Sequence, residues 1–368
     1  MSTDDRVRSI ACQFAVDGAV TAITSFGHGH INDSYMLVSD CGGQALRFLL
    51  QCINRRVFAQ PEHVMDNIRQ VTVHLRTRLA AMNAPDLGRR VLTLVPTLSG
   101  QTFHLDAEGD YWRLYRFIEG TRVYDVAPTP ELTEHAGRAF GLFQQLLTDL
   151  PAARLHAVIP DFHDTPRRFT ALEQTMREDP YGRAQETRAE IDFAFSYRSL
   201  GEVLVELQTC GELPARIAHN DAKISNLLFD NRTGEALCVT DLDTVMPGTV
   251  LYDFGDMVRS MSTTAAEDEP DTSRVSVDMS LFTALARGYL SSVRDFLTAG
   301  ERQHLVLGGQ VITLEQGVRF LTDYLRGDRY YRIAHPQHNL QRCRIQLRLA
   351  EDLIRRRPEL DRIIESLG

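Results

Sequence analysis

Short apolar runs separated by glycine-containing turns occupy the first part of the chain. Residues 23–53 alternate in this way, which predicts antiparallel strands. A helical spacing follows over residues 64–82, where the apolar positions are Val64, Ile68, Val71, Leu75, Leu79 and Met82. Strand patterns return in 89–97, 101–106 and 111–120, so the first ~120 residues are predicted to form a β-rich unit with one main helix.

The remaining sequence is predominantly helical in its periodicity. Ala136, Phe140, Phe143 and Leu147 form one stripe, and glycines at 137 and 141 allow a close helix neighbour. Helical patterns recur near 186–209, 279–297, 314–326 and 339–356, around a strand-like segment at 236–246. The acidic stretch 262–273 is predicted to be a surface loop. We therefore predict an α+β fold with an N-terminal lobe (1–116), a hinge (117–121) and a helical C-terminal lobe (122–368).

Composition narrows the class of protein. The formal net charge of −9 disfavours a general nucleic-acid binder, which needs a basic surface. The six cysteines are scattered without a CxxC pair, which is typical of reduced thiols rather than disulfides or a zinc site. No apolar run resembles a signal peptide or a membrane span. We expect a cytoplasmic protein with no membrane or nucleic-acid partner and a small-molecule substrate.

Candidate chemistry concentrates in "IAHNDAKISNLLFD", residues 217–230. Its pattern H-x-D-x-K-x-x-N comprises His219, Asp221, Lys223 and Asn226, and Asp241 follows within an apolar stretch. A kinase needs one carboxylate that accepts the proton of the substrate hydroxyl, and an amide oxygen and a second carboxylate that hold Mg²⁺ on the phosphates.

Asp221 suits the first of these roles, and Asn226 and Asp241 suit the second. Asp243 could join the metal ligands or only orient the loop. Lys223 is the single lysine beside 39 arginines, and its ammonium could stabilise charge on the transferred phosphoryl group. The simpler alternatives are that Asp221 and Asn226 cap turns, that His219 is structural and that Lys223 is a surface residue. The joint spacing of the carboxylates and the amide favours the kinase interpretation.

Two upstream segments are candidates for the nucleotide site. In "SFGHGHINDSY", Gly27 and Gly29 could let backbone N–H groups approach phosphates, with His30 and Asn32 nearby, although glycines in a hairpin often serve turn geometry alone. In "YRFIEG", the backbone of Phe117 and Ile118 could offer hydrogen bonds to an adenine ring, or the segment could be a plain linker. The predicted ligands are thus ATP and Mg²⁺.

With these motifs in place, the chain resembles the aminoglycoside phosphotransferase-like kinases, and more closely their N-acetylhexosamine 1-kinase branch. The segments that carry the resemblance include "GHINDSY", "HNDAKISNLLFD", "VTDLDTVMPG" and "YDFGDMVR". The resemblance implies a bilobal protein-kinase-like fold and ATP-dependent transfer to the anomeric hydroxyl of an N-acetylhexosamine. It also implies that Asp221 is the base, that Asp241 binds Mg²⁺, and that Arg319 and Tyr330 contact the sugar.

Other polar residues are weaker candidates for substrate binding. Asp323 lies one helical turn from Arg319, so the two could bind a sugar or simply pair with each other. His163, Asp164, Asp256 and Arg259 could also contact substrate, but a network that braces the catalytic loops is the favoured role.

The sequence departs from a protein kinase at several positions. No strand lysine is present, so Arg47 or Gln51 is the candidate for its phosphate-binding role, and the predicted 64–82 helix contains no glutamate to anchor it. Asp253 begins a D-F-G triplet, but it is too far from Asp221 to bind the metal. The absence of an A-P-E motif favours a small-molecule acceptor.

Two alternatives stay open. A kinase of the same kind could act on another sugar, an amino alcohol such as choline or homoserine, or an aminoglycoside, and a strongly acidic acceptor pocket would favour the last. A non-catalytic nucleotide-binding protein is disfavoured, because Asp221, Asn226 and Asp241 are all present.

Overall fold

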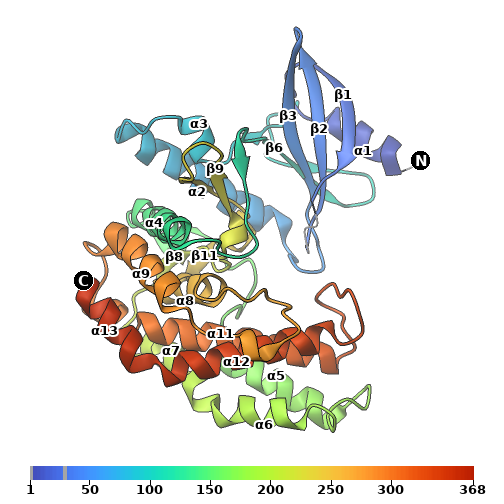
Figure 1. The fold of residues 1–368 in the computed structure, drawn as a ribbon. Helices are drawn as coiled ribbons and strands as arrows, with labels where there is room; N and C mark the ends of the chain where they lie inside the picture. The colour runs from blue at the N-terminus through green and yellow to red at the C-terminus, as the bar shows by residue number, and fades with distance from the viewer. Residues whose placement is uncertain (1–2, 28–30) are drawn as a thin grey trace.

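The computed structural model describes residues 3–27 and 31–368, with a β-rich N-terminal region above a larger helical region (Figure 1). The predicted α+β architecture, with a small sheet-containing part and a helical remainder, is confirmed. No helix among the described residues is long and apolar enough to cross a membrane.

The N-terminal sheet is antiparallel and follows the order β1-β2-β3-β6-β4, with β5 also paired to β6. Its strands are β1 (Ala19–Ser25), β2 (Asp33–Cys41), β3 (Gln44–Cys52), β4 (Leu94–Val95), β5 (His104–Leu105) and β6 (Tyr111–Arg116). Gly42 and Gly43 join β2 to β3 with φ of 63° and 87°, values that suit glycine in a tight hairpin. One face packs on α1 (Thr3–Ala11), where Val7 and Ile10 meet Phe48 and Leu114.

The main helix of this region, α2 (Pro61–Ala81), covers the predicted 64–82 segment and is followed by the short α3 (Leu87–Arg90). Because α2 begins at Pro61, it contains Glu62, so the prediction of a helix without glutamate is wrong. The Glu62 carboxylate accepts a hydrogen bond from the hydroxyl of Tyr111. The apolar face of α2 belongs to one hydrophobic cluster with Tyr115 of the sheet and with Phe143 and Leu242 of the helical region. The α2 helix therefore joins the two regions through a common core.

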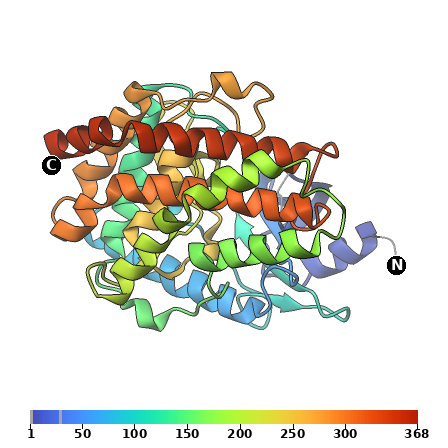
Figure 2. The same ribbon diagram turned by 90° about the horizontal axis from the view of Figure 1, so that it is seen from below.

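The helical region contains ten α-helices among the described residues. They are α4 (Pro130–Leu146), α5 (Thr165–Glu178), α6 (Arg188–Ser196), α7 (Arg198–Thr209), α8 (Val250–Met261), α9 (Met279–Val293), α10 (Ala299–Gln303), α11 (Leu305–Leu325), α12 (His338–Arg355) and α13 (Arg357–Leu367). Seen from below, α12 runs beside α11 across the base of this region (Figure 2). The α11 helix is buried over most of its surface, and α5, α8 and α12 pack against it.

The predicted close neighbour of the 136–147 helix is α9. A Cβ atom on Gly137 would lie 2.5 Å from the carbonyl oxygen of Leu285, and one on Gly141 would lie 2.9 Å from that of Tyr289. The two helices can approach so closely only because these positions carry no side chain.

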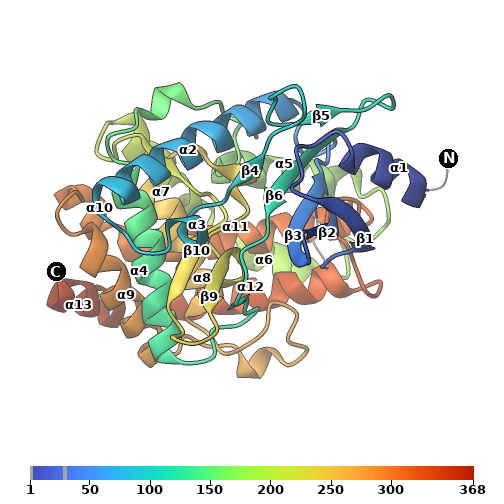
Figure 3. The same cartoon turned by 90° about the horizontal axis from the view of Figure 1, so that it is seen from above.

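Small β elements lie between the sheet region and the long helices, as the view from above shows (Figure 3). The strands β7 (Thr121–Arg122), β9 (Leu227–Asp230) and β10 (Ala236–Val239) form one sheet, and β8 (Arg216–Ala218) pairs with β11 (Met246–Gly248). The predicted strand-like segment 236–246 contains β10 and the first residue of β11. These short strands hold the two loops that carry the candidate catalytic residues. The lobe boundaries at residues 116 and 121 stay predictions.

Candidate active site

The catalytic loop runs from β8 to β9, and His219 fixes it to the next loop. The buried imidazole accepts a hydrogen bond from the Asp221 amide at Nδ1 (3.3 Å), and its Nε2 then donates to the carbonyl oxygen of Thr240 (2.8 Å). His219 therefore has the structural role, because it ties the residue before Asp241 to the loop that contains Asp221.

Asp253, the first residue of the D-F-G triplet, braces the same loop from α8. Its buried carboxylate accepts the backbone N–H groups of His219 (2.9 Å) and Asn220 (2.7 Å), and the side-chain amide of Gln144 (2.8 Å). Burial raises the pKa of Asp253 above its ordinary value despite these donors. Asp253 therefore braces the candidate catalytic loop, and Asp241 stays the candidate metal ligand.

Asp221, Lys223 and Asn226 form one cluster at the centre of the site. The Asp221 Oδ2 atom receives the ammonium of Lys223 at 2.9 Å and the Nδ2 amide of Asn226 at 2.9 Å. Burial alone would raise the pKa of Asp221, but the charge of Lys223 and these hydrogen bonds hold it below its ordinary value. Asp221 is therefore an ionised carboxylate, and its Oδ1 atom has no hydrogen-bond donor among the described residues.

Asp241 and Asp243 are two positions apart in the sequence but differ in their surroundings. Asp241 is solvent-exposed, has a φ of 55°, and makes no hydrogen bond or ion pair with another described residue. A positive φ is uncommon for a residue with a side chain and is often found at functional sites. Although the side chain reaches solvent, the protein atoms packed around it displace part of its hydration, and this desolvation, together with repulsion from Asp243 and Asp221, raises the pKa of Asp241 to about 6. This carboxylate is therefore available for a cation.

Asp243 is buried and forms an ion pair with Arg113, a residue that the sequence analysis did not single out. Both of its oxygens contact the guanidinium of Arg113 on β6, one of them at 3.0 Å, and Oδ2 also accepts the Asn32 amide at 2.7 Å. Gln51 in turn accepts Arg113 Nε at 3.0 Å. The one sequence signal for this role is that Arg113 places a charge among the apolar and aromatic residues of the strand "YWRLYR".

The two candidates for the strand-lysine role thus have other contacts. Gln51 orients Arg113, as described above. Arg47 is exposed, pairs with Glu119, and lies over the Phe117 ring at 4.4 Å. The buried cation that reaches the metal loop from the sheet is Arg113, at 1 % exposure.

The two predicted nucleotide-binding segments contact each other. Gly27 has a φ of 73°, which favours glycine, whereas Gly29 and His30 lie outside the described residues. The neighbouring Phe26 ring meets the Phe117 ring edge to face at 5.9 Å. In the predicted hinge, the N–H of Phe117 donates to the carbonyl oxygen of Arg47, while that of Ile118 has no acceptor among the described residues. Ile118 therefore offers a free backbone donor.

Arg319 and Asp323 on α11 do not pair with each other. Asp323 accepts three consecutive backbone N–H groups, from Arg329, Tyr330 and Tyr331, at 2.9–3.0 Å. It therefore shapes the loop that exposes the Tyr330 ring. Arg319 bonds to Gln316 and lies over the Phe162 ring at 5.0 Å, with no carboxylate within 4.0 Å among the described residues.

His163 is buried beneath the catalytic loop. Its Nδ1 contacts Glu315 of α11 at 2.9 Å and its Nε2 contacts the Asn220 carbonyl at 3.1 Å. Both ring nitrogens are thus used within the protein, which favours bracing over substrate binding.

The side chains present fit a Mg²⁺ ion that is bound together with phosphates. No group of three or more His, Cys, Asp or Glu side chains in the described part of the chain is arranged to hold a metal by itself. Mg²⁺ commonly uses one or two carboxylates together with substrate phosphates and water. Asp241 has the free carboxylate, and Asn226 donates its amide N–H groups to Asp221, which leaves its amide oxygen free.

Comparison with known proteins identifies the fold and the family of the chain. The chain has a kinase-like fold, in which a small sheet region adjoins a helical region. Residues 22–296 match the phosphotransferase enzyme family, and the chain therefore belongs to that family.

Several solved structures share the fold at low sequence identity. An aminoglycoside phosphotransferase from Alicyclobacillus acidocaldarius has a TM-score of 0.64 and 14% identity, over 98% of this chain and 96% of that one. A spectinomycin phosphotransferase in complex with ADP and spectinomycin has a TM-score of 0.57 and 11% identity, over 96% and 97%. A choline kinase from Cryptosporidium parvum has a TM-score of 0.56 and 13% identity, over 98% and 96%.

Proposed function

We propose that this phosphotransferase is an ATP- and Mg²⁺-dependent kinase that phosphorylates the anomeric hydroxyl of N-acetylhexosamines, GlcNAc or GalNAc, to the sugar 1-phosphate. The observation that carries the kinase assignment is the Asp221 cluster. One carboxylate oxygen is held by Lys223 and Asn226, while the other is free to face an acceptor hydroxyl.

In this mechanism, the acceptor oxygen forms a bond to the γ-phosphorus as the bond between that phosphorus and the β,γ-bridging oxygen breaks. Asp221 accepts the hydroxyl proton, and ADP leaves. Asn226 and Asp241 would hold Mg²⁺, which neutralises charge on the phosphates. Lys223 is close enough to the base to stabilise the transferred group.

Nucleotide binding is proposed at the hinge and the hairpin between β1 and β2. The free N–H of Ile118 offers a hydrogen bond to an adenine ring, and the aromatic rings of Phe26 and Phe117 offer apolar contact. A spectinomycin phosphotransferase with the same fold was solved in complex with ADP, which supports nucleotide binding.

The charges near Arg319 support a neutral, oxygen-rich acceptor over a polycationic drug. Arg168 on α5 is partly buried, and its pKa is lowered first by burial and then by the charge of Arg319. Neither guanidinium has a carboxylate within 4.0 Å among the described residues. Two such cations repel an aminoglycoside or choline, whereas the carbonyl oxygen of an acetamido group accepts hydrogen bonds from a guanidinium. The exposed Tyr330 ring could pack on a sugar face.

A panel of acceptors with ATP and Mg²⁺ tests the proposal, with NMR of the product to locate the phosphate. The panel contains GlcNAc, GalNAc, glucosamine, choline, homoserine and an aminoglycoside. We expect phosphate on C1 of an N-acetylhexosamine and no transfer by Asp221→Asn. Turnover of an amino alcohol without any turnover of an N-acetylhexosamine would reject the acceptor, and an active Asp221→Asn variant would reject the base.

A further inference from the structure

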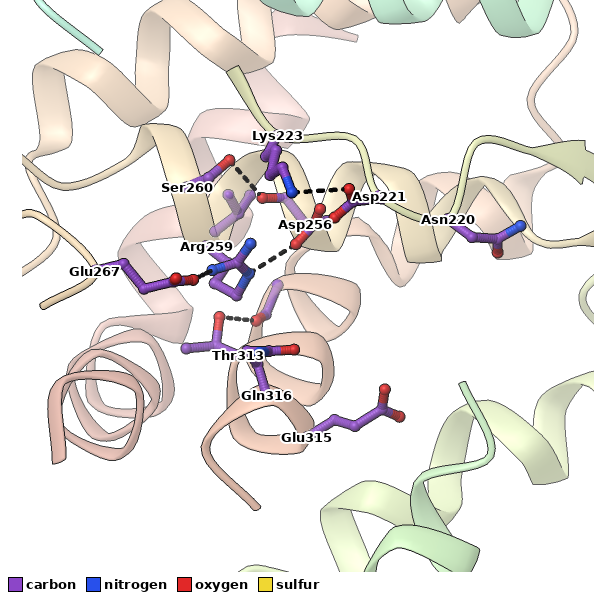
Figure 4. A network of polar contacts seen from close by, with 12 residues as sticks. Asn220, Asp221, Lys223, Asp256, Arg259, Ser260, Glu267, Thr313, Glu315 and Gln316 are labelled. Carbon is purple, nitrogen blue, oxygen red and sulfur yellow. Dashed lines mark hydrogen bonds and ion pairs between the residues drawn. The ribbon is translucent and has the colours of Figure 1, made fainter. Parts of the chain in front are cut away.

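A row of alternating charges leads from the surface loop 262–273 to the candidate base. Glu267 in this loop contacts Arg259 Nη1 at 2.9 Å, and Arg259 Nε contacts Asp256 Oδ1 at 2.7 Å. At the other end, Lys223 contacts Asp221 at 2.9 Å. Figure 4 shows the Asp256 carboxylate between the guanidinium of Arg259 and the pair formed by Lys223 and Asp221.

Among these charged residues, Asp256 has a carboxylate oxygen that lacks a hydrogen-bond donor. The residue is 4 % exposed, and its Oδ2 atom is buried without a hydrogen-bond partner. A buried carboxylate oxygen without a partner is costly, so its presence calls for an explanation. Arg259 already has a second carboxylate, Glu267, and so it does not require Asp256 for neutralisation.

The negative charge of Asp256 acts on the Lys223 ammonium. Burial lowers the pKa of the Lys223 ammonium, but neighbouring carboxylates outweigh this effect and raise the pKa above its ordinary value; they are Asp221, Asp241 and Asp256. Asp256 also lies one helical turn after Asp253 on α8, so the helix that braces the catalytic loop supplies this second carboxylate from the same side.

We propose that Asp256 is a positioning residue that acts through Lys223. Its fixed negative charge attracts the Lys223 ammonium in addition to Asp221, and thereby holds that ammonium where the transferred phosphoryl group passes. Arg259 and Glu267 hold Asp256 in this orientation. The inference rests on the proposed phosphoryl transfer, but it does not depend on which acceptor is used.

A double-mutant cycle tests the coupling, using Asp256→Asn and Lys223→Gln in the full-length protein. Asp256→Asn alone should lower kcat by about 10- to 100-fold, with the KM values of ATP and acceptor within about threefold of wild type. In the Lys223→Gln background, the same change should cost less than about threefold. Equal effects of Asp256→Asn in both backgrounds would overturn the proposal.

A matched control comes from a buried carboxylate far from Lys223. Glu301 is fully buried and pairs with Arg216 at 2.9 Å, as Asp256 pairs with Arg259. Glu301→Gln should lower the midpoint of thermal unfolding without any coupling to Lys223→Gln. Coupling of the same size in this control would show that Asp256 acts through general stability, and would reject the specific role.

The single lysine also allows a direct measurement. Lysine-selective ¹³C labelling gives one side-chain signal, that of Lys223 Cε, and Asp256→Asn should shift it whereas Glu301→Gln should leave it unchanged. If Asp256→Asn does not fold, Glu267→Gln at the exposed end of the row should produce a smaller shift, and an unmoved Lys223 signal would overturn the proposal. The cycle uses whichever acceptor the wild type phosphorylates, so a wrong acceptor would be recognised separately. Absence of any phosphoryl transfer by wild type would instead reject the proposed function.

Discussion

Arg113 on β6 and Asp243 after β10 form a bidentate ion pair that is almost closed to solvent. The pair joins the N-terminal sheet to the loop that carries Asp241, across the junction between the two regions. It therefore links the placement of the sheet to the geometry of the candidate metal site.

Arg113→Met should destabilise the protein by about 3–5 kcal/mol, because it leaves Asp243 buried without its cation. Urea unfolding followed by circular dichroism measures this loss. Arg47→Met is the matched control, since Arg47 pairs with Glu119 at the surface, and it should cost no more than about 1 kcal/mol. Similar losses in the two variants would contradict the importance of the buried pair.

The two neighbouring aspartates should respond differently to substitution by alanine. Asp241→Ala should lower kcat by at least about 100-fold without lowering the free energy of unfolding, because the carboxylate has no protein partner and its repulsion from Asp243 and Asp221 is removed. Asp243→Ala should destabilise the fold by about 3–5 kcal/mol, because Arg113 then stays buried and unpaired.

Steady-state kinetics at several Mg²⁺ concentrations, together with urea unfolding, separate these two effects. An Asp241→Ala variant with full activity at every Mg²⁺ concentration would rule out Asp241 as the metal ligand.

The contact between α4 and α9 gives a prediction that concerns stability alone. Gly137→Ala should destabilise the protein by about 1–3 kcal/mol, since the new methyl group would meet the Leu285 carbonyl at 2.5 Å and push the helices apart. Gly88→Ala on α3 is the control, because a Cβ there meets no atom within 4 Å, and it should change stability by less than about 1 kcal/mol. A tolerated Gly137→Ala would mean that the helices separate at little cost.

Local patterns predicted the fold class and the candidate catalytic loop, but they could not predict partners that are distant in sequence. The 64–82 helix and the strands before it were visible because their buried positions repeat with a fixed period. The helices α5 and α8 were missed, although Asp253, Asp256 and Arg259 of α8 recur at helical spacing among apolar residues.

The pairing of side chains was harder to predict than the elements. Asp243 seemed a possible metal ligand because of its neighbour Asp241, yet a charge 130 positions away occupies it. In the same way, His163 was a weaker candidate for substrate binding, and the partners that favour its bracing role, Glu315 and the Asn220 carbonyl, appear only in the fold. Such roles depend on contacts between residues that are distant in the sequence, and the spacing of residues within one segment does not reveal them.

Asp323 offers the sharpest test of the proposed acceptor pocket. Its carboxylate accepts the backbone N–H groups of residues 329–331 and also the Asn339 amide at 3.0 Å, so it holds the loop that exposes Tyr330. Asp323→Asn replaces one accepting oxygen by a donor and should loosen this loop. We expect the KM of the acceptor to rise by about tenfold, which corresponds to roughly 1.4 kcal/mol, while the KM of ATP changes by less than about twofold.

Asp352→Asn is the control for Asp323→Asn, because Asp352 is also buried and also accepts a backbone N–H, that of Val277 at 2.8 Å. This variant should lower stability without raising the acceptor KM selectively. If both variants changed the two KM values equally, the effect would reflect general loosening of the helical region. If Asp323→Asn raised only the KM of ATP, the loop at 329–331 would belong to the nucleotide site, and the acceptor would have to bind elsewhere. A selective rise in the acceptor KM is the one result that places the acceptor against the Tyr330 loop.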